Sequence, residues 1–169
     1  MSHFLARAGF AATLAVLPSL SFAGGMAVVD FQQALNDVNE GKIVQARLEG
    51  MYTEKKKSID QMEKQLMAMQ QEYEQQALVM TPDALKAKER EIMQAQMVYQ
   101  QEVQKAEMEF QAQYNQEMET LLGKMAEICE AMGKEKGYDM VIERNAGVVY
   151  TSAPDITGDL VVRYNAKYQ

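Results

Sequence analysis

The sequence has one cysteine, three prolines, one histidine and no tryptophan among its 169 residues. Its ten glycines and 24% charged residues exclude collagen-like and low-complexity chains. Beyond residue 23 no stretch approaches the roughly 18 uncharged apolar residues that a membrane-spanning helix requires. The composition therefore predicts a folded chain rather than a disordered one or a polytopic membrane protein.

The first 23 residues have the pattern of a secretory signal peptide. One basic residue, Arg7, precedes a small and apolar run over residues 8–17, and Ser21 and Ala23 place small residues before a cleavage site. We expect cleavage after Ala23 and export from the cytoplasm, with a buried N-terminal helix as the alternative. Cleavage would remove His3, the one histidine of the chain.

The loss of histidine removes most familiar site chemistry. Without it there is no Ser/His/Asp or Cys/His pair and no imidazole ligand for zinc. The glycines form neither a P-loop nor a dinucleotide-binding pattern. We therefore predict no catalytic residues, no metal site and no cofactor. An enzyme that uses a pair of carboxylates is the remaining alternative.

The single cysteine, Cys129, has no partner for an intrachain disulfide. Its neighbours Ile128 and Met132 favour a buried thiol over a reactive or intermolecular one. Asp30 and Asp155 stand at expected strand and helix boundaries, so we interpret them as helix caps rather than catalytic acids.

The charge balance excludes one class of partner. The chain has 17 basic and 24 acidic residues, a net charge of −7, and cleavage after Ala23 would leave 16 basic and 24 acidic residues. A surface of this sign repels phosphate backbones. We therefore expect no nucleic acid partner.

Residues 42–136 have coiled-coil spacing, because apolar residues recur at alternating steps of four and three. Three successive steps of four, from Ala106 to Met118, form a stutter that should locally unwind a supercoil. The first seam contains Leu48, Tyr52, Ile59, Met62, Leu66, Met69 and Tyr73, and the second contains Ile92, Tyr99, Val103, Ala106, Phe110, Tyr114, Met118, Leu121, Met125, Ile128 and Met132.

The two seams meet at a helix boundary. Thr81 can cap a new helix, Pro82 suits its first position, and Asp83 suits the positive end of its dipole. Because short connections usually fold helices back on each other, we predict an antiparallel helical-hairpin arm with its tip near residue 81. A single continuous bent helix is the alternative.

Residues 24–41 and 137–169 remain for a small β body. We expect strands at 26–30, 139–143 and 147–151, with Asn145 to Gly147 turning the last two into a β-hairpin. Short helices are expected at 31–38 and after a capping Thr157. The fold class is therefore mainly α with a small β body (α+β), in which the coiled-coil hairpin projects from the body.

So few residues and such short strands make a weak core for one chain. We therefore expect the strands of several copies to join in one oligomerisation body. Its expected residues are Val28, Val29, Val141, Ile142, Val148, Val149 and Tyr150.

Three stretches resemble a known family: AVVDFQQALND at 27–37, LVMTPDALKAKE at 78–89 and GYDMVIERNAGVVYTSAPDIT at 137–157. They are similar to the Skp/OmpH family of periplasmic chaperones. The resemblance implies a homotrimer in the periplasm whose helical arms enclose a cavity. It also implies that this cavity holds unfolded outer-membrane proteins without the use of ATP. Some family members are strongly basic, whereas this chain is acidic, so contact with lipopolysaccharide or a membrane is doubtful.

Methionine suits such a role, because its flexible side chain adapts to many apolar sequences. Twelve of the 14 methionines lie between residues 51 and 140. At about 100° per residue, three of them point away from the second seam. The candidate client-binding residues are Met93, Met97 and Met108, with Met67 and Val79 on the first arm.

Two alternatives stay open. The methionines can be ordinary surface or packing residues, and the chain can be an extracytoplasmic coiled-coil tether or assembly scaffold for one folded partner. A scaffold predicts one stoichiometric partner, whereas a holdase predicts reduced aggregation of several unrelated unfolded proteins.

Overall fold

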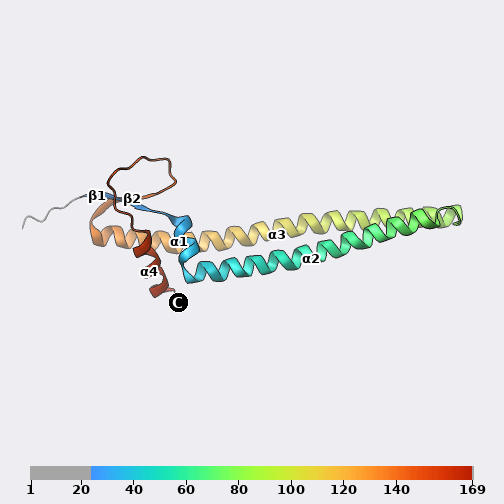
Figure 1. The fold of residues 1–169 in the computed structure, drawn as a ribbon, viewed down its shortest axis with the longest axis horizontal. Helices are drawn as coiled ribbons and strands as arrows, with labels where there is room; N and C mark the ends of the chain where they lie inside the picture. Colours follow the sequence, from blue (N-terminus) through green and yellow to red (C-terminus); the bar gives the residue numbers. More distant parts are fainter. Residues whose placement is uncertain (1–23, 169) are drawn as a thin grey trace, which may run out of the picture.

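The computed structural model describes residues 24–168, which form a long helical hairpin attached to a small body (Figure 1). The expected fold class, mainly α with a small β body, is confirmed. The expected signal peptide at residues 1–23 lies outside the described residues. The elements in chain order are β1 (Gly25–Val29), α1 (Phe31–Asp37), α2 (Asn39–Gln76), α3 (Pro82–Lys136), β2 (Tyr138–Glu143) and α4 (Thr157–Lys167).

The helices α2 and α3 lie side by side and antiparallel, and they form the arm (Figure 1). At the start of α3 the Thr81 hydroxyl accepts the N–H of Ala84 at 3.3 Å, and Pro82 occupies the first turn. At its end Gly137 adopts a left-handed conformation with φ 72°, and its N–H donates to the carbonyl of Gly133. The predicted hairpin and its tip are confirmed, and the alternative of one continuous helix is wrong.

The most deeply buried seam residues of the arm lie at its root. Near the body the seam residues Leu48, Leu121 and Met125 are buried, whereas the seam residues from Ile59 to Tyr73 and from Ile92 to Val103 are half-buried. Polar pairs cross the outer part of the arm, including an ion pair of Lys88 with Glu72 at 3.0 Å. Apolar packing therefore holds the root of the arm more firmly than its tip.

The sheet is parallel and has two strands, with Ala27 opposite Val141 and Val28 opposite Ile142. On its other side β1 pairs with the segment before α4. The N–H of Val28 donates to the carbonyl of Pro154 at 2.9 Å, and the N–H of Ile156 donates to the carbonyl of Val28 at 2.8 Å. The strand β1 therefore lies between two partners.

The predicted β-hairpin is wrong. Residues 147–151 form no strand in the described chain, and β2 pairs with β1 instead. After β2 the chain turns at residues 144–147, where Gly147 has φ 73°, and then loops across to the far side of β1. The hydrogen bonds of Val28 with Pro154 and Ile156 hold the end of this loop away from β2.

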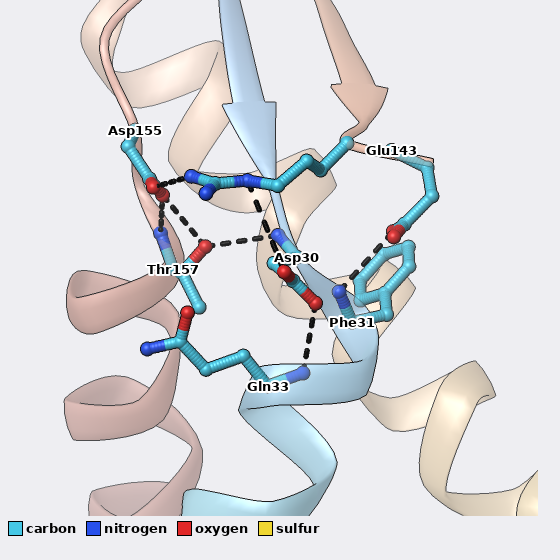
Figure 2. Close-up of polar contacts among 7 residues, drawn as sticks. Asp30, Phe31, Gln33, Glu143, Asp155 and Thr157 are labelled. Carbon is cyan, nitrogen blue, oxygen red and sulfur yellow. Dashed lines mark hydrogen bonds and ion pairs between the residues drawn. The ribbon is translucent and has the colours of Figure 1, made fainter. Parts of the chain in front are cut away.

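A polar network joins the strand ends to the helix starts (Figure 2). Asp30 caps α1, because its carboxylate accepts the N–H of Gln33 at 2.8 Å, as expected. Its own N–H donates to the Thr157 hydroxyl at 2.9 Å. Arg144 forms an ion pair with Asp155, and its Nε lies 3.8 Å from the Asp30 carboxylate. The ends of β1 and β2 are thereby fixed to the starts of α1 and α4.

Thr157 was expected to cap α4, but it is the first residue of that helix. The carboxylate of Asp155 accepts both its N–H, at 2.9 Å, and its hydroxyl, at 2.6 Å. Burial raises the pKa of Asp155, but the two hydrogen bonds from Thr157 and the charge of Arg144 outweigh it, and the pKa lies below its ordinary value. Asp155 therefore performs the capping role as a carboxylate.

Candidate interaction surfaces

The five candidate client-binding residues are all exposed, and they lie along the arm rather than in one pocket. Met67 is on α2, Met93, Met97 and Met108 are on α3, and Val79 is in the turn at the tip. The structure does not bring them together in one site. They form a dispersed surface, which we call the methionine surface.

The tip has a second aliphatic side chain that the sequence analysis missed. Leu78 is 96% exposed and its neighbour Val79 is 84% exposed. The N–H groups of Val79 and Met80 both donate to the carbonyl of Gln76, at 3.0 and 3.1 Å. This turn satisfies the backbone while it leaves both side chains without packing partners. The sequence contains a signal for this second side chain, because Leu78 directly precedes Val79 in the segment before Thr81.

A groove at the arm root lies between α1, α2 and α3 and has a volume of about 470 Å³. We call it the root groove. Sequence reasoning missed it, because Tyr52 and Tyr114 fit the coiled-coil seams, yet both are exposed. Its lining residues are Gln32, Leu35, Asn36, Gly41, Gln45, Leu48, Glu49, Tyr52, Phe110, Tyr114, Met118 and Leu121.

At the root of the arm, a half-buried polar cluster joins α2 and α3 to α4. Glu40 accepts hydrogen bonds from Lys124 Nζ at 2.6 and 2.8 Å and from the Tyr164 hydroxyl at 2.5 Å. Burial raises the pKa of Glu40, but these hydrogen bonds and the lysine charge prevail and hold it below its ordinary value. Lys124 also lies 4.8 Å from the centre of the Tyr168 ring. We call this group the root cluster.

Reactive groups are not concentrated anywhere in the part of the chain that the structure describes. Cys129 is buried, as expected, and burial with the nearby charge of Glu143 raises the pKa of its thiol to about 11. A thiol with that pKa is a poor nucleophile at neutral pH. Within residues 24–168 no three His, Cys, Asp or Glu side chains gather as a metal site would require.

The seven residues expected in the oligomerisation body divide into three groups. Val28 and Val29 are buried within the single chain, and Val141, Ile142 and Tyr150 are half-buried. Val148 and Val149 are exposed, and Val149 reaches 92%. The loop that carries them is tied to β1 at both ends, by the N–H of Arg144 on the Val29 carbonyl and by the Pro154 carbonyl on the Val28 N–H.

No described helix has a stretch long and apolar enough to cross a membrane. The fold is that of a helical arm on a small β body, with exposed apolar side chains along the arm. The chain belongs to the outer membrane protein (OmpH-like) family, whose model matches residues 25–164.

Individual relatives resemble the chain over nearly its whole length. Chaperone protein Skp of Pectobacterium atrosepticum is 24% identical over 161 residues, which cover 95% of this chain and 98% of the relative. Chaperone protein Skp of Yersinia enterocolitica is 22% identical over the same shares. A crystal structure of a candidate outer membrane chaperone (OmpH-like) from Caulobacter crescentus has a TM-score of 0.74 at 16% identity. It covers 97% of this chain and 90% of that one.

Proposed function

We propose that this protein is an ATP-independent periplasmic holdase chaperone that binds unfolded outer-membrane proteins between the helical arms of a homotrimer. The observation that carries the proposal is the methionine surface, which is exposed along the arm and converges on no shaped pocket. The family membership and the relatives named Chaperone protein Skp support it. The export pattern at residues 1–23 supports a periplasmic location.

The proposed binding depends on many weak contacts. A methionine side chain has three rotatable bonds and a polarisable sulfur, so it can pack against different client residues. Contacts that are weak individually hold a chain when several arms present them at high effective concentration. Such a surface binds the unfolded client and not the folded one, so folding of the client elsewhere drives release. The mechanism requires no catalytic residue and no nucleotide.

The body supports the proposed assembly. Val148 and Val149 are apolar and exposed, yet their loop is fixed at both ends to β1. Apolar side chains that lie exposed next to each other are typical of a surface that another protein covers. We propose that further copies of this chain cover it. The number three comes from the family resemblance.

The test changes Met93, Met97 and Met108 together to Gln. Met and Gln have similar helix propensities, and all three side chains are exposed, so stability should change little. We expect the dissociation constants for two unrelated unfolded β-barrel proteins to rise at both low and high salt. Affinity that is unchanged in the variant but abolished by 0.5 M salt would point to charge instead of apolar contact. Specific binding of one folded protein, without any effect on aggregation, would favour the scaffold.

A further inference from the structure

The root groove differs in chemistry from the methionine surface. Its floor is formed by Leu48 and Leu121, which are buried, and its walls carry three aromatic rings. The rings of Tyr52 and Phe110 meet edge to face, with centroids 6.0 Å apart and an angle of 67° between their planes. Tyr52 is 57% exposed and Tyr114 is 43% exposed. Aromatic surface therefore stands open beside a concave, apolar floor.

The rim of the groove suits an extended polypeptide. Gln32, Asn36 and Gln45 line it, and a side-chain amide both donates and accepts hydrogen bonds, as a free backbone segment does. Glu49 is the one charged residue among the described lining residues. Its carboxylate accepts hydrogen bonds from a cationic side chain and repels an acidic one. The groove therefore favours an uncharged or basic segment.

The root groove is built by close packing of α1 against α2. A Cβ atom at Gly41 would lie 1.9 Å from the carbonyl oxygen of Leu35, so only glycine allows α2 to approach α1 this closely. The volume of about 470 Å³ is within the range of sites that enclose a small ligand. Such a space admits a few side chains and excludes a folded domain.

We propose that the root groove binds aromatic side chains of unfolded outer-membrane proteins, an inference that rests on the proposed function. Transmembrane β-barrels carry girdles of aromatic residues at both edges of their apolar band. Aromatic rings gain affinity from each other beyond the area they bury. The groove thus selects aromatic client segments, whereas the methionine surface binds apolar residues without such selection.

A second copy of the chain fits the groove less well. The exposed apolar loop of the body carries the small side chains Val148 and Val149, which would leave an aromatic-walled groove poorly filled. Poor filling forfeits the dispersion contacts that stabilise an interface. The choice between these occupants is one outcome of the test.

The absence of tryptophan from the chain permits a direct test. A short extended peptide with one Trp beside an Arg gives the only tryptophan emission, and burial in the groove should shift that emission to the blue in a saturable way. Changing Tyr52 and Tyr114 together to Ser should weaken binding at least about tenfold, whereas changing both to Phe should preserve it. Ile43→Gln, an exposed position outside the groove, is the matched control.

Circular dichroism and solution mass accompany each variant. Gln45→Lys serves as a second variant, because it places a cation on the rim without altering a seam residue, and it should also weaken binding. Equal binding by the Ser double variant, or a change in its solution mass that assigns the groove to contact between copies, would overturn the inference.

The same experiment separates this inference from the proposed function. A wild-type protein that suppresses aggregation of unfolded β-barrel clients but leaves the peptide emission unchanged overturns the groove assignment alone. A wild-type protein that shifts the emission but suppresses no aggregation overturns the proposed function and, with it, the assignment of the groove to clients.

Discussion

Glu40 and Lys124 are 84 positions apart in the sequence, and the lysine Nζ donates to both carboxylate oxygens, at 2.6 and 2.8 Å. The contact joins the start of α2 to the root half of α3. Each side chain is 29% exposed, so water screens the pair less than it screens the open pair of Lys134 with Glu130. With the Tyr164 hydroxyl on the same carboxylate, three helices meet at one charge.

Replacing this carboxylate should loosen the arm root. We expect Glu40→Gln to lower the free energy of unfolding by about 1–3 kcal/mol, because Lys124 and Tyr164 would lose a charged acceptor. Chemical denaturation followed by circular dichroism measures the change. Glu130→Gln is the matched control, since Glu130 pairs with Lys134 in the open and should contribute almost nothing. Equal effects of the two changes would deny the root cluster a special role.

Acid should destabilise the protein through the same carboxylates. The pKa values of Glu40 and Asp155 lie below their ordinary values of 4.5 and 3.8, so the unfolded chain binds protons first as the pH falls. Their contribution is present above about pH 4.5 and is lost as the pH passes through the lowered pKa values. We expect the melting temperature to drop in that range. The drop should be smaller in Glu40→Gln, and an identical acid profile would contradict the assignment.

Glycine at position 41 should stabilise the fold relative to alanine, whereas glycine at position 50 should not. An alanine Cβ at Gly41 would lie 1.9 Å from the Leu35 carbonyl oxygen, a backbone atom that cannot move without shifting α1. We expect Gly41→Ala to destabilise the protein by about 1–3 kcal/mol, despite the better helix propensity of alanine. The control is Gly50→Ala on the same helix, where no atom lies within 4 Å. It should stabilise the protein by about 0.5–1 kcal/mol.

The body loop offers a test of assembly that does not disturb the single chain. Val149 is almost fully exposed, so Val149→Asp should cost the isolated chain nothing, yet it would place an unpaired charge in an interface between copies. We expect the solution mass to fall to that of one chain with helix content unchanged. Val162→Asp, at another exposed position, should leave the mass as it was. An undiminished mass in the Val149 variant would remove this loop from the interface.

The sequence predicts those parts of the fold that depend on local chemistry. Thr81 and Pro82 define the start of α3, and the steps of four and three define the faces along which the two helices pack. The β-hairpin prediction failed because strand pairing is a long-range property. Residues 147–151 have strand propensity, but the end of their loop pairs with β1 on the side away from β2. The hydrogen bonds of Val28 with Pro154 and Ile156 hold it there, whereas β2 occupies the other side of β1.

The candidate sites also differ in whether they depend on local sequence or on long-range packing. The exposure of Met93, Met97 and Met108 follows from the helical period alone, and all three side chains are exposed in the structure, whereas their contact with clients stays a prediction. The root groove could not be predicted, since it needs α1 to pack against the side of the arm. Tyr52 and Tyr114 occupy seam positions in the sequence and become groove walls only because of that third helix.

The parallel pairing of β1 with β2 makes the whole arm a crossover connection between two neighbouring strands. Inserting or deleting matched heptads in α2 and α3 would therefore move the tip without altering the strand register or the polar network at the strand ends. Arm length can vary in evolution or by design while the body remains the same. In an assembly of such chains the depth of the enclosed space would be an adjustable dimension, independent of what holds the copies together.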